Sequence, residues 1–254
     1  MQVTLTEAED QLCQLLDNAT RWLGKERPDL PPVELRIAGG WVRDKLLGLE
    51  SHDLDIAVNS MTGYEFAQQL AAYQQHIGQP VKSIAKIASN PERSKHLETA
   101  TSVVLGLSLD FVHLRCEEYQ EHSRIPNSVT FGTPTQDAYR RDITINTLFY
   151  NVHRREVEDF TDMGLRDLQE GIVRTPLAPY ETFMDDPLRV LRCIRFATRF
   201  QFRIDADVYE CMSDSSIKMA LQKKISRERI GVEVGKMLQG KHNTLCTCLP
   251  ACMH

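Results

Sequence analysis

The chain has 254 residues, of which 42% are hydrophobic, and this predicts a globular protein with one good core or two modest ones. Disordered and fibrous classes are therefore excluded. No apolar run approaches the roughly 20 residues that a membrane-spanning helix needs. The formal net charge of −5 means that any nucleic-acid partner must be held by a local basic surface.

The N-terminus and the cysteines indicate a cellular compartment. The first twenty residues contain acids but no lysine or arginine, which argues against a signal or transit peptide at Met1. The seven cysteines are an odd number, and four stand singly in apolar segments, as reduced structural thiols usually do. We therefore expect a reducing compartment and a cytoplasmic location, with nuclear or mitochondrial pools left open.

The apolar spacing predicts a mixed α/β part followed by an all-helical part, which is an α+β fold class. A capping box of Thr6 and Glu9 opens the first helix. In chain order, the expected elements are a helix at about 6–24, a strand at 35–38, a helix at 41–47, a strand at 54–58, a helix at 64–76, antiparallel strands at 103–107 and 109–114, a helix at 137–150 and a strand at 155–160. The segment 171–183, which holds two prolines, is the expected domain joint.

Gly39 and Gly40 stand between a predicted strand and a predicted helix. Glycines at such a place let the backbone approach a ligand, and the unpaired N–H groups that open the helix favour phosphate. Arg43 lies about one helical turn further along and can meet the same phosphates. The alternative is an ordinary tight turn.

The motif DLDIAV places Asp53 and Asp55 on one face of a strand, while Leu54 and Ile56 point into the core. Two carboxylates this close repel each other unless a hard cation such as Mg²⁺ takes their oxygens as ligands. The alternative is a solvated edge strand with two exposed aspartates.

Asp110, in the run LSLDFVHLR, is a candidate third acid. Three carboxylates around Mg²⁺ ions suit phosphoryl transfer, because the metal activates an attacking hydroxyl and neutralises the leaving pyrophosphate. The alternative is an aspartate at a strand end or in a turn.

The run YRRDITINTLFY carries Arg141, Asp142 and Asn146. On the predicted helix Asp142 and Asn146 are one turn apart and project together. Such a cluster suits a triphosphate, bound through arginine, and a ribose hydroxyl, bound through the acid or the amide. The alternative is a helix with surface ion pairs.

The segment DDPLRVLRCIRFATRF carries arginines along one predicted helix face: Arg189, Arg192, Arg195 and Arg199. This basic ridge suits phosphates. Asp186 accepts and Arg189 donates hydrogen bonds, so the two match cytosine and adenine and clash with guanine and uracil. The alternative is a structural role for Asp186 as a helix N-cap, with Pro187 in the first turn.

Six motifs, in this order, resemble the signature of the class II tRNA nucleotidyltransferases, which comprise CCA-adding enzymes and bacterial poly(A) polymerases. They are GGWVRDKLLG, HDLDIAV, RRDITIN, DFTDMGLRDLQEGIVRTP, DDPLRVLRCIRFATRF and ISRERIGVE. The residues within these motifs look like those of the eukaryotic CCA-adding branch, and the resemblance covers about residues 35–238. It implies template-independent addition of C, C and A to the 3′ end of tRNA from CTP and ATP, with release of pyrophosphate.

The resemblance also implies roles for single residues. Asp53 and Asp55 would hold Mg²⁺, the expected cofactor, and Asp110 would be the third catalytic acid. The expected nucleotide-binding residues are Gly39, Gly40, Arg43, Arg141, Asp142, Asn146, Asp186, Arg189, Arg192 and Arg195. Asp186 and Arg189 would read the base. The segment from Arg227 to Glu233 would brace the helical part.

The resemblance divides the chain into four parts. They are an N-terminal helix at 1–30, a nucleotidyltransferase head with a small mixed β-sheet flanked by helices at 31–175, an all-α neck at 176–240 and a tail outside the family pattern at 241–254. The family's tRNA-gripping body and tail are expected to be missing. Expected partners are the tRNA 3′ end, ATP and CTP, with no membrane and no obligatory protein partner. A poly(A) polymerase and an inert nucleotide- or RNA-binding fragment stay open as alternatives.

Overall fold

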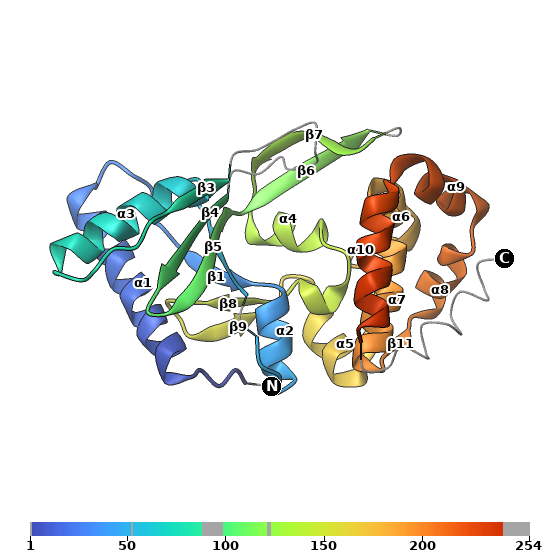
Figure 1. Cartoon of the computed structure of the whole chain (residues 1–254), viewed down its shortest axis with the longest axis horizontal. Helices are drawn as coiled ribbons and strands as arrows, with labels where there is room; N and C mark the ends of the chain where they lie inside the picture. Colours follow the sequence, from blue (N-terminus) through green and yellow to red (C-terminus); the bar gives the residue numbers. More distant parts are fainter. Residues whose placement is uncertain (1, 52, 88–98, 121–122, 241–254) are drawn as a thin grey trace. The chain divides into compact units, whose positions relative to one another are not determined.

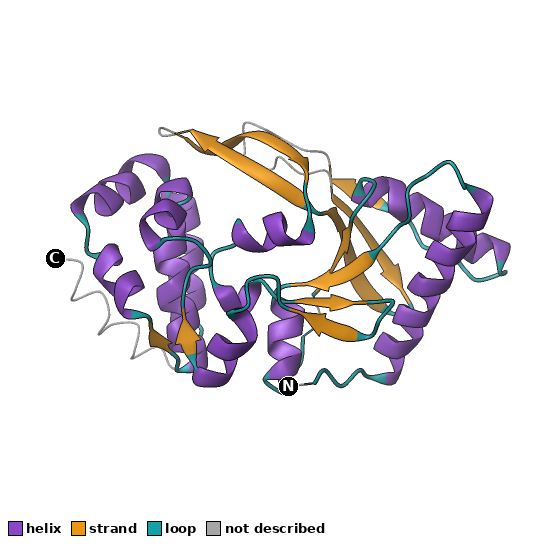
Figure 2. Cartoon of the chain, turned by 180° about the vertical axis from the view of Figure 1, so that it is seen from behind, coloured by secondary structure: helices purple, strands orange, loops and turns teal. Residues whose placement is uncertain are grey.

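The computed structural model describes residues 2–51, 53–87, 99–120 and 123–240, so the predicted tail at 241–254 lies outside the described residues. The chain forms two compact units. Unit 1 contains Met1–Cys116, Val129–Asp137 and Leu148–Phe160, and unit 2 contains Glu117–Ser128, Ala138–Thr147 and Thr161–His254. Unit 1 combines a mixed sheet with helices, and unit 2 is mainly helical; Figure 2 shows which segments are helices and which are strands. Within the described ranges, no helix combines the length and the apolar character that crossing a membrane requires.

Unit 1 is built on a mixed sheet whose described strands follow the order β3-β4-β5-β2-β1-β8-β9. These strands are β1 (Leu35–Ala38), β2 (Leu54–Val58), β3 (Ala85–Ile87), β4 (Thr99–Val104), β5 (Leu107–His113), β8 (Phe149–Asn151) and β9 (Glu156–Glu158). β2 and β5 pair in parallel, whereas the other neighbours are antiparallel. The central strands therefore place alternate apolar side chains in the core, and the intervening residues reach the other face.

Three helices accompany this sheet: α1 (Glu7–Glu26), α2 (Gly40–Leu46) and α3 (Gly63–His76). α3 contacts β2, β4 and β5, α1 contacts α3, and α2 contacts β1 (Figure 1). Gly63 begins α3 directly against β5. A Cβ at this position would lie 2.0 Å from the carbonyl oxygen of Phe111, so the close approach of helix and strand requires glycine.

Glu9 connects α1 to α2. The Thr6 hydroxyl accepts a hydrogen bond from the Glu9 N–H, and the Glu9 carboxylate accepts one from the Thr6 N–H, so the predicted capping box is confirmed. The same buried carboxylate accepts hydrogen bonds from Trp41 Nε1 at 3.0 Å and from Lys45 Nζ at 2.6 Å. These contacts fix the short α2 and, with it, the glycine turn that precedes it.

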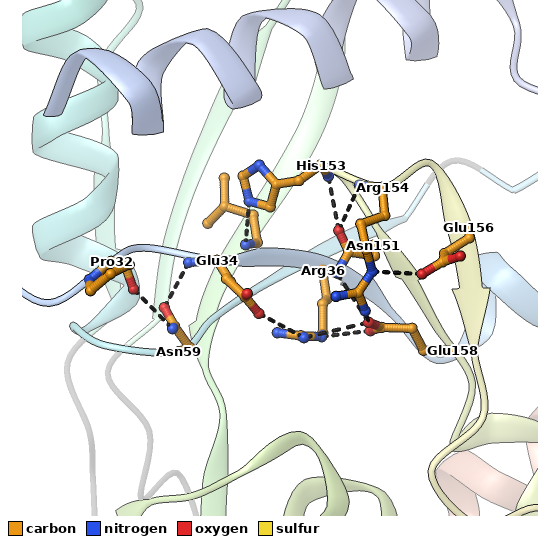
Figure 3. A network of polar contacts seen from close by, with 10 residues as sticks. Pro32, Glu34, Arg36, Asn59, Asn151, His153, Arg154, Glu156 and Glu158 are labelled. Carbon is orange, nitrogen blue, oxygen red and sulfur yellow. Dashed lines mark hydrogen bonds and ion pairs between the residues drawn. The ribbon is translucent and has the colours of Figure 1, made fainter. Parts of the chain in front are cut away.

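A second buried network ties β1 to β8 and β9 (Figure 3). Arg36 Nε lies 2.6 Å from Glu158 Oε2, and Asn151 Nδ2 donates to Glu158 Oε1 at 3.0 Å. Both charged side chains are less than a tenth exposed. Arg36 also pairs with Glu34 at 2.8 Å, and Glu158 also pairs with Arg154, so the strands are joined by a network of ion pairs rather than by one pair.

Unit 2 consists mainly of helices. They are α5 (Gly164–Glu170), α6 (Pro179–Asp185), α7 (Leu188–Phe200), α8 (Ala206–Met212), α9 (Ser215–Lys224) and α10 (Arg227–Leu238). A short parallel pair, β10 (Ile172–Val173) and β11 (Arg203–Ile204), accompanies them. α7 and α10 pack side by side (Figure 1). The paired strands β6 (Arg115–Gln120) and β7 (Ser123–Phe131) and helix α4 (Pro134–Tyr139) belong partly to each unit.

The α+β class is confirmed, but the helix predicted at 137–150 is wrong. α4 ends at Tyr139, a 3₁₀ turn η2 covers Thr144–Asn146, and β8 begins at Phe149. The backbone between them bonds elsewhere: the Ile143 N–H donates to the Asp142 side chain at 3.0 Å, and the Thr144 N–H donates to the distant Arg174 carbonyl at 2.8 Å. These bonds replace the i to i−4 ladder that a helix needs.

The hairpin predicted around residues 103–114 exists with shifted boundaries. β4 ends at Val104 and β5 begins at Leu107, so the turn consists of Leu105 and Gly106. Both turn residues have positive φ, 51° and 81°, which is typical of a tight two-residue hairpin. The turn therefore lies two to three residues before residue 108, which separates the two predicted strands.

Candidate functional site

Asp53 and Asp55 lie at the start of β2, and both are exposed. The neighbouring Leu54 and Ile56 are 1% and 0% exposed. Strand side chains alternate between faces, so the two carboxylates share the solvent-facing side of the sheet. The motif predicts this arrangement, and the structure has it.

Asp110 lies in the middle of β5, at the position paired with Asp55 across the parallel β2–β5 ladder. It is exposed, whereas Leu109 and Phe111 are fully buried. The Thr101 hydroxyl of β4 donates a hydrogen bond of 2.5 Å to Asp110 Oδ1. The structure thus brings a third carboxylate beside Asp55, and Thr101 fixes its orientation.

These three acids fit Mg²⁺ in donor chemistry, since carboxylate oxygens are the hard ligands that this ion takes. In the described part of the chain, no group of three or more His, Cys, Asp or Glu side chains is close enough to hold a metal ion by itself. Mg²⁺ is usually bound by one or two carboxylates and completes its shell with water and substrate phosphates. The arrangement therefore suits an ion that arrives with a polyphosphate rather than a metal cage made by the protein alone.

The glycine pair lies at the same end of the sheet as the acids, because β1 runs antiparallel to β2 and ends where β2 begins. Gly39 has a φ of 67°, a region where other residues are strained, and its N–H donates to the Leu148 carbonyl at 2.9 Å. The fold itself explains Gly39. A Cβ at Gly40, in contrast, would meet only Arg43 Nη2 at 3.5 Å, an ordinary contact distance. Among the described residues, none gives a steric reason for glycine at position 40, which is consistent with close approach of a ligand.

Arg43 lies next to Gly40, but it is buried. Its side chain is 4% exposed, and its Nε and Nη2 lie 2.8 and 2.7 Å from Asp44 Oδ1. A guanidinium has five N–H donors, so a phosphate contact is compatible with the Asp44 pair only through the remaining donors. The phosphate-binding role of Arg43 stays a prediction.

In unit 2, the structure brings Arg141, Asp142 and Asn146 together without the predicted helix. Asn146 Nδ2 donates to Asp142 Oδ1 at 3.0 Å, and Arg141 Nη1 donates to the Asn146 carbonyl at 3.1 Å. Arg192 of α7 binds Asp142 Oδ2 through Nε and Nη2, each at 2.7 Å. Both oxygens of Asp142 are therefore engaged, so a ribose hydroxyl would have to displace one of these donors.

The surroundings of Asp142 lower the pKa of its carboxyl group. Burial alone would raise its pKa, but the charges of Arg192 and Arg189 and the hydrogen bonds from Asn146 and Arg192 outweigh it. The pKa of Asp142 therefore lies well below its ordinary value, and the carboxylate stays ionised. The same pair raises the pKa of Arg192.

Two arginines of the predicted basic ridge on α7, Arg192 and Arg195, are paired with acids. Besides binding Asp142, Arg192 lies 3.6 Å from Glu233 Oε1, and Arg195 Nε lies 2.6 Å from Glu233 Oε2. The guanidinium of Arg195 also lies over the Phe196 ring, 4.1 Å from its centroid. Glu233 of α10 is 4% exposed. The ridge is thus an ordered ion-pair network, and nucleotide contacts by Arg192 and Arg195 stay predictions.

The two residues predicted to read the base lie in different surroundings. Asp186 precedes α7, and its Oδ1 accepts a hydrogen bond from the Leu188 N–H at 3.2 Å, as a capping side chain does. Pro187 occupies the N-cap position, one residue before the predicted first turn. Arg189 is 7% exposed and donates to the carbonyls of Thr182 and Arg140.

Two residues of this arrangement, Asp44 and Thr101, were not predicted, and Glu233 was predicted only as the end of the segment 227–233 that would brace the helical part. Asp44 follows Arg43 directly, so their adjacency was a readable signal. Thr101 stands in an alternating strand pattern, but the pattern does not show which strand pairs with β5. Glu233 is 38 residues from Arg195, and helical spacing gives no signal for a contact across that separation.

The amino-acid sequence of the chain matches the model of a known protein family. Residues 35–174, more than half of the chain, match the family model described as the poly(A) polymerase head domain. The chain belongs to this family. The matched range includes every described strand of the mixed sheet and the acids Asp53, Asp55 and Asp110.

Individual relatives narrow the comparison. The chain is 56% identical over 243 residues to the mitochondrial CCA tRNA nucleotidyltransferase of Saccharomyces cerevisiae, an alignment that covers 94% of this chain and 44% of that protein. A solved CCA-adding enzyme in complex with ATP superposes with a TM-score of 0.74 at 27% identity, covering 97% of this chain and 50% of the other. The structure of a CCA-adding enzyme with CTP gives 0.70 at 28% identity, covering 95% and 51%. The chain thus spans about half the length of the proteins it resembles.

Proposed function

We propose that the chain is the catalytic part of a template-independent RNA nucleotidyltransferase that adds C, C and A to the 3′ end of tRNA from CTP and ATP, with release of pyrophosphate. The observation that carries this proposal is the exposed set of Asp53, Asp55 and Asp110 on neighbouring strands. The similarity to a CCA tRNA nucleotidyltransferase and to CCA-adding enzymes bound to ATP and CTP supports the choice of substrates.

In this proposal Asp53 and Asp55 hold Mg²⁺ through their carboxylate oxygens. When bound, the ion supplies charge stabilisation to the polyphosphate and lowers the pKa of the attacking hydroxyl. Asp110, held by Thr101, presents the third carboxylate beside the reacting phosphate. Gly40 lets the backbone approach the triphosphate, and no covalent intermediate with the protein is needed.

Residues of unit 2 bind the nucleotide in this proposal. Arg141 and Asn146 contact the triphosphate and the ribose, and Asp142 holds Asn146 and Arg192 in place for those contacts. Asp186 accepts a hydrogen bond from the exocyclic amine of cytosine or adenine, and Arg189 donates to the ring nitrogen. Guanine and uracil present a carbonyl and a ring N–H at these positions. The carbonyl would face the Asp186 carboxylate, which is also an acceptor, and the N–H would face Arg189, which is also a donor.

We also propose a cytoplasmic location, with a mitochondrial pool suggested by the printed name of the yeast relative. The proposed partners are the tRNA 3′ end, ATP and CTP, with no obligatory protein partner. Imaging of the tagged full-length product in cells, with matched cytoplasmic and mitochondrial markers, tests the location. Signal confined to mitochondria would contradict it.

The direct test of the activity is incubation of the chain with tRNA that lacks its 3′ CCA and with all four nucleotides, a different one of which is labelled in each reaction. We expect incorporation of CTP followed by ATP, three nucleotides in all, and none of UTP or GTP. Intact tRNA that already ends in CCA is the matched control and should accept nothing. Incorporation of all four nucleotides without distinction would contradict the proposal.

Two observations leave alternative functions open, and the same experiment tests them. The family model is named for poly(A) polymerase, and such an enzyme would add many adenosines and reject CTP. The chain covers 44% of the yeast relative, so a fragment that binds nucleotide with Mg²⁺ and incorporates none, even with excess tRNA, is the second alternative. Product length and nucleotide binding separate the three outcomes.

A further inference from the structure

An arginine outside the predicted base-reading pair lies directly on Asp186. Arg229 of α10 donates from Nη2 to Asp186 Oδ2 at 2.8 Å, and its Nη1 lies 3.4 Å from Oδ1. The Leu188 N–H also donates to Oδ1. Each carboxylate oxygen thus has a donor, and the two-point contact with the guanidinium fork fixes the plane of the carboxylate.

Arg189 does not share this contact. Its Nη1 donates to the Thr182 carbonyl at 3.3 Å and its Nη2 to the Arg140 carbonyl at 2.6 Å. Arg229, in contrast, is 31% exposed and Asp186 is 19% exposed, so both remain within reach of solvent. The charged partner that orients Asp186 is therefore Arg229.

Arg229 lies at a position of α10 where a positive side chain needs an acidic partner. It stands in the first turn of the helix, and its N–H donates to the N-capping hydroxyl of Ser226. Positive side chains are unfavourable at a helix N-terminus because the macrodipole is positive there. The pair with Asp186 offsets this cost and connects α10 to the start of α7.

We propose that Arg229 is a positioning residue that sets the base preference of the nucleotide site by holding the Asp186 carboxylate in one orientation. This inference rests on the proposed function, because it assumes that Asp186 accepts a hydrogen bond from the base. A carboxylate held at both oxygens keeps its remaining lone pairs pointing in fixed directions, which match an amine donor and repel a carbonyl. A carboxylate free to rotate would accommodate uracil through a water molecule or a new angle and lose this discrimination.

The test measures binding of CTP and UTP, each with Mg²⁺, by titration calorimetry on the full chain. Arg229→Gln removes the charge and the fork, and we expect it to lower the preference for CTP over UTP by about tenfold, since a charge-assisted contact to the discriminating group is lost. Arg229→Lys keeps the charge without the fork, so its preference for CTP over UTP should lie between those of the wild type and Arg229→Gln. The matched control is Arg227→Gln, in the same helical turn and exposed, which should keep the wild-type preference.

A double variant separates positioning from general stability. If Arg229 acts through Asp186, Arg229→Gln should not change the preference further once Asp186→Ala is present. A variant that keeps the wild-type preference while its Tm falls would overturn the inference and leave the proposed function standing. A wild-type chain with no preference for CTP over UTP would refute the proposed function, and the inference with it.

Discussion

Asp55 and Asp110 occupy paired positions on the parallel strands β2 and β5, and both side chains are exposed. In-register residues of neighbouring strands point to the same face, so the two carboxylates lie on the same face of the sheet. Their mutual repulsion is relieved when a cation binds between or beside them. The proposed metal-binding role of the acids rests on this relation.

Thr101 should matter for activity although it cannot bind a metal strongly. Thr101→Val keeps the shape of the side chain but removes the hydroxyl that donates to Asp110, so the carboxylate loses its fixed orientation. We expect nucleotide incorporation to fall by about tenfold, the cost of one lost hydrogen bond of roughly 1–1.5 kcal/mol. Thr101→Ser, which retains the hydroxyl, should keep most of the activity in the same assay.

Asp142 should make a contribution to stability that depends on pH. Its pKa is lowered in the folded state from an ordinary value of 3.8, so the contribution is fully present above that pH. It is lost as the pH falls below 3.8 towards the folded pKa, because the unfolded chain then takes up the proton first. Asp142→Asn should therefore lower the free energy of unfolding at pH 7 by about 3 kcal/mol.

Urea unfolding of the wild type and of Asp142→Asn at a series of pH values checks this prediction. The difference between the two proteins should be constant from pH 7 to about pH 5 and should shrink at lower pH. A difference that grows on acidification would mean that Asp142 is protonated in the folded protein, contrary to the ion pair with Arg192.

Two glycines should respond to alanine in opposite directions. Gly63→Ala places a methyl group 2.0 Å from the Phe111 carbonyl oxygen, so the helix must move off the sheet, and we expect a loss of about 2–3 kcal/mol. Gly235→Ala in α10 meets nothing within 4 Å and should stabilise the helix by about 1 kcal/mol. Denaturant midpoints measure both changes, and equal effects of the two variants would contradict the packing described here.

The sequence predicts the local parts of the site well. The capping box at Thr6, the alternation of Asp53 and Asp55 and the turn at Gly39 follow from short-range rules, and the structure has each of them. Hydrophobic spacing fails at 137–150, where Asp142 and Thr144 bond to partners that a helix would not allow. A run of β-branched residues there also weakens the helix, although their apolar spacing resembles one.

Contacts between distant segments could not be predicted. The spacing of Arg189, Arg192 and Arg195 correctly places them on one helix, but it does not reveal that Asp142 and Glu233 neutralise two of them. The pairing of Asp186 with Arg229 spans 43 residues. Such ion pairs depend on how helices pack, and a pattern along one helix carries no information about the charges on its neighbour.

The metal-binding role of Asp53 and Asp55 is the central claim, and Mg²⁺-dependent binding of CTP tests it most directly. The measurement compares the dissociation constant of CTP with and without Mg²⁺ for the wild type and for the double variant Asp53→Asn and Asp55→Asn, with thermal unfolding as the check on folding. We predict that Mg²⁺ tightens CTP binding in the wild type and has little effect in the variant, which should fold normally because both side chains are exposed. An equal effect of Mg²⁺ on the two proteins would contradict the account.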